Sequence, residues 1–539
     1  MPDSVIIGFL HTHTPETTSS PSSSQGHVNL PHGAPHDILS LFLDHCESRP
    51  DAPFLIGPDG AELSYRGAAF RAAQIADAFR AQGVKPGDRV AVQIEKSQMA
   101  LLTWLAALHV GAVYLPLNTA YTIGELRYFL GDARPALVLC RTADEPAMSE
   151  LCSELGVPAL LTLDAEGTGG TLVEAAAGAP VVTARHIPRA DDLAAILYTS
   201  GTTGRSKGAM LSHANLATNA LTLRDYWRFT SADRLLHALP IFHTHGLFVA
   251  TNVTIAAGSA IIFLPRFDAD ELVRLMPRAS VLMGVPTFFS RLLGHAGFTR
   301  ELASHMRLFI SGSAPLSAEV HKDFAALTGQ AILERYGMTE TNMNTSNPYD
   351  GQRKPGSVGY PLPGVSLRIA QPESGGALPQ GEIGVIEVKG PNVFRGYWQM
   401  PEKTAEEFRN DGYFITGDLG YIDSEGYVHI VGRAKDLIIA GGFNIYPAEV
   451  EAALDEIPGI AESAVIGVPH VDMGEAVVAV VKASDPALDA DAVIAALADR
   501  LARFKQPRAV VFVDELPRNT MGKVQKALLR QEHVALFAN

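Results

Sequence analysis

One stretch of the sequence has residue types suited to holding a polyphosphate, Tyr198–Gly208, which reads YTSGTTGRSKG. Its glycines let the backbone approach phosphate oxygens closely, and its hydroxyl and N–H groups can donate hydrogen bonds to them. Arg205 and Lys207 offset the negative charge. The pattern G-x-x-x-x-G-K-[S/T] does not fit the stretch, so it is not a Walker A loop. These residues predict a phosphate-binding loop, and the alternative is a flexible surface loop.

The elements that must position this loop alternate between helices and strands. The loop follows Leu193–Tyr198, an apolar run typical of a buried strand, and the amphipathic helix Arg66–Gln82 precedes the short strand Arg89–Ile94. The same rhythm recurs twice, at Met99–Leu108 into Ala112–Leu115 and at Ile123–Leu130 into Ala136–Cys140. Strands that alternate with helices predict stacked α/β layers.

The rhythm changes in the last third of the chain. From about Gly364 to Val431, short alternating segments separated by Gly and Pro predict a small β subdomain, and helices return after Gly432–Lys435. We therefore predict an α/β fold. A large N-terminal domain, 36–434, contains the stacked layers and the β subdomain, and a small α+β C-terminal domain, 435–539, follows.

Composition excludes several classes of protein. The 539 residues suit about three or four folding units. The 43 basic and 58 acidic residues give a net charge of −15, which disfavours nucleic acid and anionic membranes as partners. The longest apolar stretch, Val253–Leu264, is shorter than the roughly 20 residues of a membrane span and predicts a buried strand pair or core helix. The three cysteines show no C-x-x-C spacing, which excludes a disulfide scaffold and suits a reducing compartment.

The N-terminal segment, residues 1–35, is rich in Ser, Thr and Pro and contains neither Lys nor Arg. A secretory signal needs a basic region and a mitochondrial presequence needs arginines, so neither is predicted. We expect a disordered extension or a start codon placed too early, and a cytoplasmic protein.

Eight motifs together resemble the acyl-adenylate-forming superfamily, which contains acyl-CoA synthetases, adenylation domains and beetle luciferases. Besides the phosphate loop, seven matches follow in the superfamily's order over roughly residues 36–535. They are Pro240–Gly246, Ser311–Leu316, Tyr336–Glu340, Tyr413–Asp418, Gly432–Asp436, Gly441–Glu451 and Pro517–Lys526.

The resemblance implies an ATP site. Asp418 would accept hydrogen bonds from the ribose, Tyr336 and Gly337 would pack against adenine, and Arg433 would reach ribose or phosphate. Glu340, with Thr199, would bind Mg²⁺ through hard oxygen atoms. Lys523 would stabilise the charge that develops when a carboxylate attacks the α-phosphate, and His243 is also predicted to be catalytic. The remaining predicted ATP or AMP contacts are Ser200, Gly201, Thr202, Thr203, Gly204, Lys207, Ser313, Ala314, Pro315, Glu334, Arg335, Met338 and Thr339.

The residues near the expected acyl site indicate which acid the protein uses. Polar groups at His243, Thr244, His245 and Arg291 suit an acid with a second carboxylate, which Arg would bind in a fork. Arg335 is the next choice for that role, and a solvent-facing Arg291 is the alternative. The sequences of several motifs are similar to those of bacterial malonyl-CoA synthetases. This resemblance implies malonate as the substrate, with methylmalonate also accepted, and a pocket rim formed by Thr244 and Met343.

The superfamily also uses its mobile C-terminal domain twice. By resemblance, one orientation supplies Lys523 for adenylation, and rotation about a hinge at Lys435 brings Gly441, Gly442 and Phe443 to the CoA channel. ATP, Mg²⁺ and CoA are the implied cosubstrates. Acetylation of Lys523 by a lysine acetyltransferase, reversed by a deacetylase, would act as an off-switch.

Three other functions remain open from the sequence. The first is a CoA ligase for another short-chain acid, and the second is a free-standing adenylation enzyme that loads a carrier protein. The third is a non-catalytic nucleotide-binding homologue, which would be expected to lack Lys523, Glu340 or Asp418, and all three are present.

Overall fold

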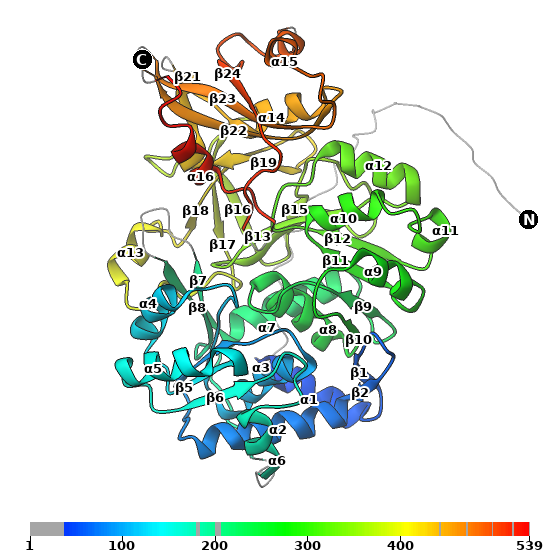
Figure 1. Ribbon diagram of the computed structural model, residues 1–539, viewed down its shortest axis with the longest axis vertical. Coiled ribbons are helices and arrows are strands. Elements are labelled where there is room, and N and C mark those ends of the chain that lie inside the picture. Colours follow the sequence, from blue (N-terminus) through cyan, green and yellow to red (C-terminus); the bar gives the residue numbers. More distant parts are fainter. Residues whose placement is uncertain are drawn as a thin grey trace, which may run out of the picture.

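The fold was analysed in a computed structural model, which describes residues 37–178, 184–199, 206–440, 443–470, 473–498, 500–519 and 522–537. The predicted extension, residues 1–35, lies outside them. The described chain forms an α/β fold of four sheets and their covering helices, with the C-terminal sheet stacked above the rest in Figure 1.

The first sheet contains the two described ends of the predicted phosphate loop, Thr199 and Lys207. Its strand order is β6-β5-β3-β4-β7-β8, parallel except for the final antiparallel pair. The strands are β3 (Arg89–Gln93), β4 (Val113–Pro116), β5 (Leu137–Arg141), β6 (Leu160–Leu163), β7 (Leu193–Thr199) and β8 (Lys207–Ser212). The helices of this region are α1 (Ile38–Ser48), α2 (Tyr65–Ala81), α3 (Gln98–Val110), α4 (Ile123–Ala133), α5 (Glu145–Leu155) and α6 (Thr171–Gly178).

Local signals explain where several of these helices begin and end. Thr122 and Glu125 form a capping box at the start of α4, so two otherwise unpaired backbone donors are satisfied. Gly111 ends α3 in the left-handed conformation that glycine adopts without strain. The predicted helices and strands of this region are confirmed, with ends that differ by a few residues.

The second sheet has nine strands in the order β15-β14-β13-β12-β11-β9-β10-β1-β2 and positions most of the remaining polar side chains discussed below. Its strands are β1 (Pro53–Ile56), β2 (Glu62–Ser64), β9 (Arg234–His237), β10 (Ala260–Phe263), β11 (Val281–Gly284), β12 (Leu308–Ser311), β13 (Leu333–Met338), β14 (Asn342–Ser346) and β15 (Tyr360–Pro361). Its helices are α7 (His213–Tyr226), α8 (Asn252–Ala257), α9 (Ala269–Leu275), α10 (Pro286–Leu293), α11 (Arg300–Ala303) and α12 (Ala318–Thr328).

The apolar stretch Val253–Leu264 differs from its prediction. It contains the end of α8 and the whole of β10, a helix followed by a strand, and both are buried. Gly258, at φ 65°, turns the chain between them. The described helices include none long and apolar enough to cross a membrane.

The predicted β subdomain is an antiparallel sheet in the order β16-β17-β18-β19. It consists of β16 (Ser366–Ala370), β17 (Gly384–Lys389), β18 (Phe414–Ile422) and β19 (Val428–Arg433), with α13 (Pro401–Glu406) between β17 and β18.

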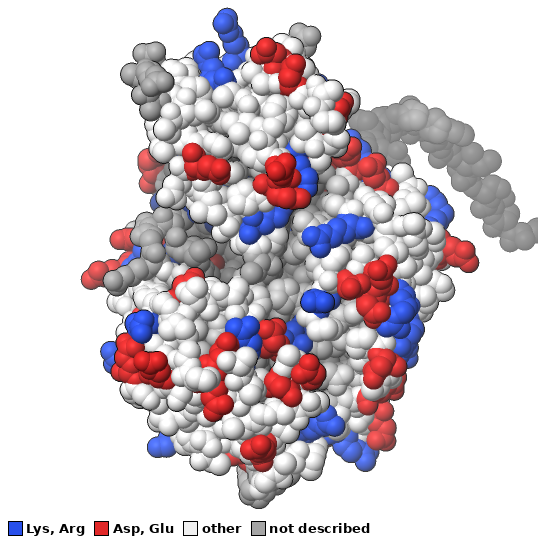
Figure 2. Space-filling view, in the orientation of Figure 1, with Lys and Arg blue, Asp and Glu red and all other residues white. Residues whose placement is uncertain are grey.

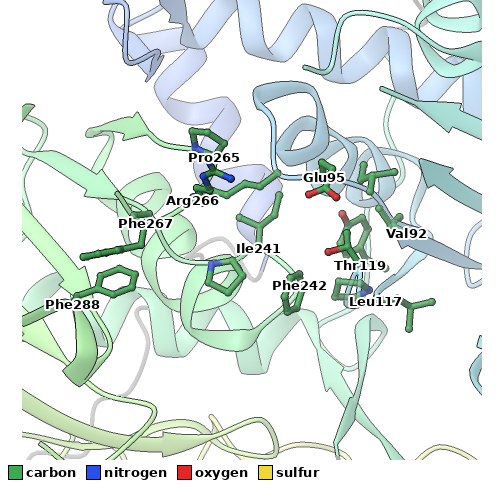
Figure 3. A pocket seen from close by; sticks show the side chains of 16 residues that line it. Val92, Glu95, Leu117, Thr119, Ile241, Phe242, Pro265, Arg266, Phe267 and Phe288 are labelled. Carbon is green, nitrogen blue, oxygen red and sulfur yellow. The ribbon is translucent and has the colours of Figure 1, made fainter. Parts of the chain in front are cut away.

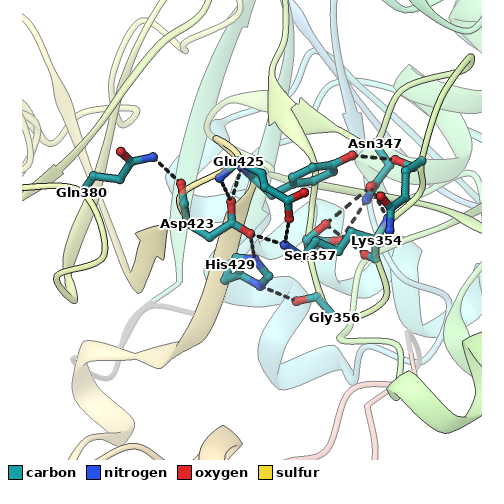
Figure 4. Close-up of polar contacts among 10 residues, drawn as sticks. Asn347, Lys354, Gly356, Ser357, Gln380, Asp423, Glu425 and His429 are labelled. Carbon is teal, nitrogen blue, oxygen red and sulfur yellow. Dashed lines mark hydrogen bonds and ion pairs between the residues drawn. The ribbon is translucent and has the colours of Figure 1, made fainter.

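A polar network joins this subdomain to the segment after β14. Lys354 Nζ donates to Asp423 at 2.7 Å and also pairs with Glu425, while His429 Nε2 lies 2.9 Å from Asp423 Oδ2. The other ring nitrogen of His429 contacts the Gly356 carbonyl at 3.1 Å (Figure 4). The network therefore fixes the chain that leaves the β13–β14 hairpin.

The C-terminal part forms its own sheet and covering helices. Strands run β21-β20-β23-β22, and β24 pairs with β23. They are β20 (Ile438–Ala440), β21 (Phe443–Ile445), β22 (Ile460–His470), β23 (Gly474–Ala483) and β24 (Ala509–Phe512), with helices α14 (Pro447–Asp455), α15 (Ala490–Leu497) and α16 (Lys526–Glu532). Lys435 lies in a short 3₁₀ turn, Ala434–Asp436, between β19 and β20. The division at Lys435 stays a prediction.

Surface charges of both signs are interspersed on the face shown in Figure 2. On that face neither Lys and Arg nor Asp and Glu gather into one large patch.

Candidate active site

The two ends of the phosphate loop lie side by side at one edge of the first sheet. Thr199, the last residue of β7, is paired in register with Lys207, the first residue of β8. Thr199 Oγ1 donates to Glu340 Oε1 at 3.3 Å. Residues 200–205 lie outside the described residues, and with them the predicted contacts Ser200, Gly201, Thr202, Thr203 and Gly204.

Glu340 lies at the centre of an oxygen-rich cluster. Its carboxylate is buried in the turn between β13 and β14 and also receives a contact from the Tyr397 hydroxyl at 3.1 Å. Burial raises the pKa of Glu340, and the Tyr397 hydroxyl and the nearby positive charge of Lys207 partly oppose that shift. A buried carboxylate with hydroxyl oxygens beside it is a set of oxygen atoms that fits a hard cation such as Mg²⁺.

A second group of side chains surrounds Asp418 on β18. Tyr336 donates its hydroxyl to Asp418 Oδ2 at 2.5 Å, and Arg433 Nε lies 2.7 Å from Asp418 Oδ1. Asp418 and Arg433 face each other in register on β18 and β19, so the antiparallel pairing itself brings them together. Burial and the Asp418 charge raise the pKa of Tyr336, which keeps the phenol protonated.

Lys523 approaches this group from the C-terminal part. Its side chain is accessible to solvent, although protein atoms surround much of it, and desolvation together with Arg433 lowers its pKa, which Asp418 partly opposes. The adjacent Gly522 lies against α10, because a Cβ at Gly522 would be 3.5 Å from Thr287 Oγ1. The loop that carries Lys523 is therefore docked on the nine-stranded half of the molecule, next to the Asp418 group.

A third group lies where β12 and β13 end. The Arg335 guanidinium packs on the backbone of Gly312, where a Cβ would be 2.3 Å from Arg335 Cζ, so a larger residue at this position would displace the guanidinium. Ser313, at φ 74°, turns its hydroxyl to within 3.0 Å of His245 Nδ1. Such a φ is strained for a residue with a side chain, which is typical of functional sites.

This third group contains buried polar atoms that have no hydrogen-bond partner among the described residues. Arg335 is only 4% exposed, and among the described residues its Nε and Nη2 have no hydrogen-bond acceptor. His245 Nε2 and Thr244 Oγ1 are likewise buried and unpaired within the described chain. Burial lowers the pKa of Arg335 to about 9, and burial with the Arg335 charge lowers the pKa of His245. Burying a polar group without a hydrogen-bond partner costs folding free energy, so this arrangement suits an anionic ligand that accepts hydrogen bonds from these groups.

Comparison with known proteins identifies the family. A sequence model described as "AMP-binding enzyme" matches residues 42–398, and one described as "AMP-binding enzyme C-terminal domain" matches residues 449–523. The chain belongs to the AMP-binding enzyme family.

Three relatives of this AMP-binding enzyme illustrate the likeness. A feruloyl-CoA synthase from Amycolatopsis is 38% identical over 478 residues, 88% of this chain and 94% of that protein. A malonate–CoA ligase from Arabidopsis thaliana is 34% identical over 481 residues, 83% of this chain and 78% of that protein. The crystal structure of ATP-bound MatB from Rhodopseudomonas palustris is 57% identical, with a TM-score of 0.90, and covers 93% of this chain and 99% of that one.

The structure of the enzyme brings most of the predicted nucleotide residues to one region. Ala314 and Pro315 follow Ser313 in the loop after β12, and Gly337 and Met338 end β13 with Thr339 in the next turn. Glu334 is buried beside Arg335, and burial raises the pKa of its carboxyl to about 8. These roles stay predictions.

The predicted acyl residues divide into two sets. His243, Thr244 and His245 form one segment beside Arg335, while Met343 packs against Gly337, with its Cε 2.5 Å from the position of a Cβ there. Burial lowers the pKa of His243 to about 4, so its ring is neutral at pH 7. Arg291, the first choice to bind the second carboxylate, takes the solvent-facing alternative in this structure, and whether it binds the acid stays a prediction. Its side chain is exposed on α10, with its guanidinium 5.5 Å from the ring of Phe267, because its position on the helix faces away from the core.

The predicted CoA residues are placed only in part. Gly441 and Gly442 lie outside the described residues, while Phe443 on β21 is exposed and stacks on Phe504 with ring centroids 4.6 Å apart. In the part of the chain before Lys435, a cavity of about 260 Å³ lies between strands β3 and β4 on one side and the segment Pro240–Phe242 on the other (Figure 3).

A buried lysine at this cavity was not found from the sequence. Lys96 Nζ lies 2.9 Å from both Nδ1 and the carbonyl oxygen of His237, whose Nε2 contacts the Gly246 carbonyl at 2.9 Å. The chain of contacts anchors the Pro240–Gly246 segment. Tyr397 and Glu407, which touch Glu340 and Lys207, were also missed, because neither belongs to a motif with a recognisable spacing.

Proposed function

We propose that the enzyme is an ATP-dependent malonate:CoA ligase that forms AMP and also accepts methylmalonate. The observation that supports this proposal most is the buried guanidinium of Arg335 beside His245 and Ser313, whose Nε and Nη2 have no acceptor among the described residues. A monocarboxylic acid would leave this cation without a counter-ion, whereas the second carboxylate of malonate would satisfy its free N–H groups in a fork. The likeness to malonate–CoA ligase from Arabidopsis thaliana and to MatB supports the same substrate.

The first half-reaction joins the acid to AMP. A malonate oxygen attacks the α-phosphorus of ATP, the bond to the bridging oxygen breaks, and pyrophosphate leaves. Asp418 would hold the ribose hydroxyls and Lys207 would offset phosphate charge, while Thr199 and Glu340 would hold Mg²⁺, which supplies charge neutralisation. Lys523 lies beside Asp418 and Arg433, which suits a cation that stabilises the attack.

The second half-reaction makes the thioester. The sulfur of CoA attacks the acyl carbonyl, its proton is released, and the bond to AMP breaks. We propose that rotation about Lys435 removes Lys523 and brings Gly441, Gly442 and Phe443 toward the CoA channel. The solvent-accessible Lys523 could then also be reached by an acetyltransferase, and loss of its charge would stop adenylation.

The substrate is tested by pyrophosphate release with ATP, Mg²⁺ and CoA, comparing malonate, methylmalonate, succinate, acetate and octanoate. A clear preference for malonate is expected. A preference for acetate or octanoate would overturn the second-carboxylate pocket and keep only the ligase mechanism. Replacing CoA with a carrier protein separates the ligase from a carrier-loading enzyme.

A matched pair of variants tests the clamp itself. Arg335→Leu should reduce kcat/KM for malonate by a factor of about 10² to several 10³, equivalent to roughly 3–5 kcal/mol for a broken buried charge pair, and should shift preference toward propionate. Arg291→Leu on the exposed face of α10 is the comparison. If Arg291→Leu abolishes malonate use and Arg335→Leu does not, the clamp is Arg291.

A further inference from the structure

The side chain of Glu407, just after α13, reaches two different parts of the nucleotide site. Its Oε1 lies 2.7 Å from Lys207 Nζ at the end of the phosphate loop, and its Oε2 accepts the Tyr397 hydroxyl at 2.6 Å. The Lys207 ammonium also lies 4.2 Å from the centre of the Tyr397 ring. Lys207, Tyr397 and Glu407 thus form one compact unit.

Backbone hydrogen bonds to two strands, β8 and β18, hold this unit in place. Segment 396–398 pairs with β8, because Met210 N donates to Gly396 O at 2.9 Å and Trp398 N donates to Gly208 O at 2.7 Å. Glu407 O accepts from Ile415 N at 2.8 Å, on the strand that carries Asp418. The contacts of Glu407 therefore join the phosphate loop to the ribose-binding strand.

Tyr397 connects the unit to the predicted metal ligand. Its single hydroxyl proton faces two carboxylates, Glu407 Oε2 at 2.6 Å and Glu340 Oε1 at 3.1 Å. One proton can be donated to only one acceptor at a time, and the shorter contact is the one to Glu407. Glu340 Oε1, which also accepts from Thr199, is therefore more available to a cation as long as Glu407 holds that proton.

We infer that Glu407 is a positioning residue for adenylation, which orients Lys207 toward the phosphates and keeps Tyr397 from capping Glu340. The inference rests on the proposed function for its ATP-using step alone, and on no feature of the acid. In Glu407→Gln, the amide would donate to the Tyr397 oxygen and turn the hydroxyl proton toward Glu340, while Lys207 would lose its counter-ion.

Nucleotide binding tests the inference without any acid or turnover. Titration calorimetry with a non-hydrolysable ATP analogue, repeated over a range of Mg²⁺ concentrations, gives the concentration that supports half-maximal binding. We expect Glu407→Gln to raise that concentration at least threefold and to lower the single-turnover adenylation rate 10- to 100-fold, with the KM for the acid unchanged. A wild-type enzyme that binds the analogue but does not adenylate malonate would overturn the proposed substrate and leave this test intact.

Glu406→Gln is the matched control. Lys403 contacts both carboxylates, Glu406 at 2.9 Å and Glu407 at 3.4 Å, while Glu406 is exposed and lies outside the unit. This variant should match the wild type, and thermal melting checks that all variants fold. In a Tyr397→Phe background, Glu407→Gln should change the Mg²⁺ requirement less than 1.5-fold, because residues that act through one contact are not additive. Equal effects of Glu406→Gln and Glu407→Gln, a full additional effect in Tyr397→Phe, or wild-type behaviour of Glu407→Gln would each overturn the inference.

Discussion

At the scale of single residues, Lys523 belongs to the C-terminal part but lies near Asp418 and Arg433 of the larger part, where we propose that it acts in adenylation. Lys523→Ala should reduce adenylation by a factor of about 10²–10³, since one preorganised charge is removed from the transition state. Thioester formation from supplied malonyl-AMP should change little. Pyrophosphate release and malonyl-CoA formation, measured separately, check this, and an equal loss of both half-reactions would contradict the assignment.

The pH dependence of adenylation follows from the same side chain. Desolvation and Arg433 lower the pKa of Lys523, and only the protonated form can stabilise negative charge. The adenylation rate should therefore decline, as pH rises, at a lower pH than the ordinary lysine value of about 10.4 would give. The alkaline limb should disappear in Lys523→Arg, whose guanidinium stays charged. A limb that is unchanged in this variant would assign the titration to another group.

Arg291 and Arg335 show how much of a site can be predicted from residue types in a sequence. Arg291 and Arg335 both stand near motifs, and a one-dimensional pattern does not tell which side of an element faces the core. The fold separates them, because α10 turns Arg291 to solvent while β13 buries Arg335 on Gly312. Glu407 and Tyr397 were beyond prediction for a related reason. Their contacts with Lys207 join positions about 200 residues apart in the chain.

At the scale of elements, the Asp423 network holds the segment after β14 on the β18–β19 hairpin. Burial raises the pKa of Asp423, but hydrogen bonds from Lys354 and His429 outweigh this effect and bring the pKa below its usual range. A carboxyl with a lowered folded-state pKa stabilises the fold above its unfolded pKa of about 3.9, and this stabilisation is lost as pH falls below that value.

Asp423→Asn should therefore lower the free energy of unfolding by roughly 1–3 kcal/mol at pH 7, the range for hydrogen bonds to charged groups. The difference from wild type should shrink below about pH 4. Denaturant unfolding at pH 7 and pH 3.5 measures it, and Glu425→Gln, at the more exposed partner of Lys354, is the milder control. A difference that grows on acidification would contradict this sign.

Element types were predicted well where the periodicity was clear, as for α2, β3 and the β subdomain. The prediction was poorer in Val253–Leu264, where every residue is buried and neither a helical nor a strand period is visible. Uniform burial removes the alternation on which such an assignment depends.

At the scale of the whole molecule, the hydrophobic side chains fall into separate cores. Within the described residues, three core clusters contain side chains from positions up to 430, and two further clusters contain only side chains from Ile438 onward. No described cluster mixes the two sets. The C-terminal part can thus lose its packing without opening the cores of the larger part.

Calorimetry should consequently show two unfolding transitions, the smaller belonging to the C-terminal part. Gly522→Trp, which would crowd the contact with Thr287, should shift the smaller transition and leave the larger one in place. A single transition whose calorimetric and van't Hoff enthalpies agree would show instead that the parts unfold as one unit.

The separate cores on either side of a short 3₁₀ turn also have a consequence for the evolution of the protein. A recombination event with its crossover near Ala434–Asp436 would sever one backbone link and no shared core. Lineages could then exchange the part that carries Lys523 while they keep the proposed acid pocket around Arg335, so that acid specificity and the lysine-bearing part would diverge at different rates.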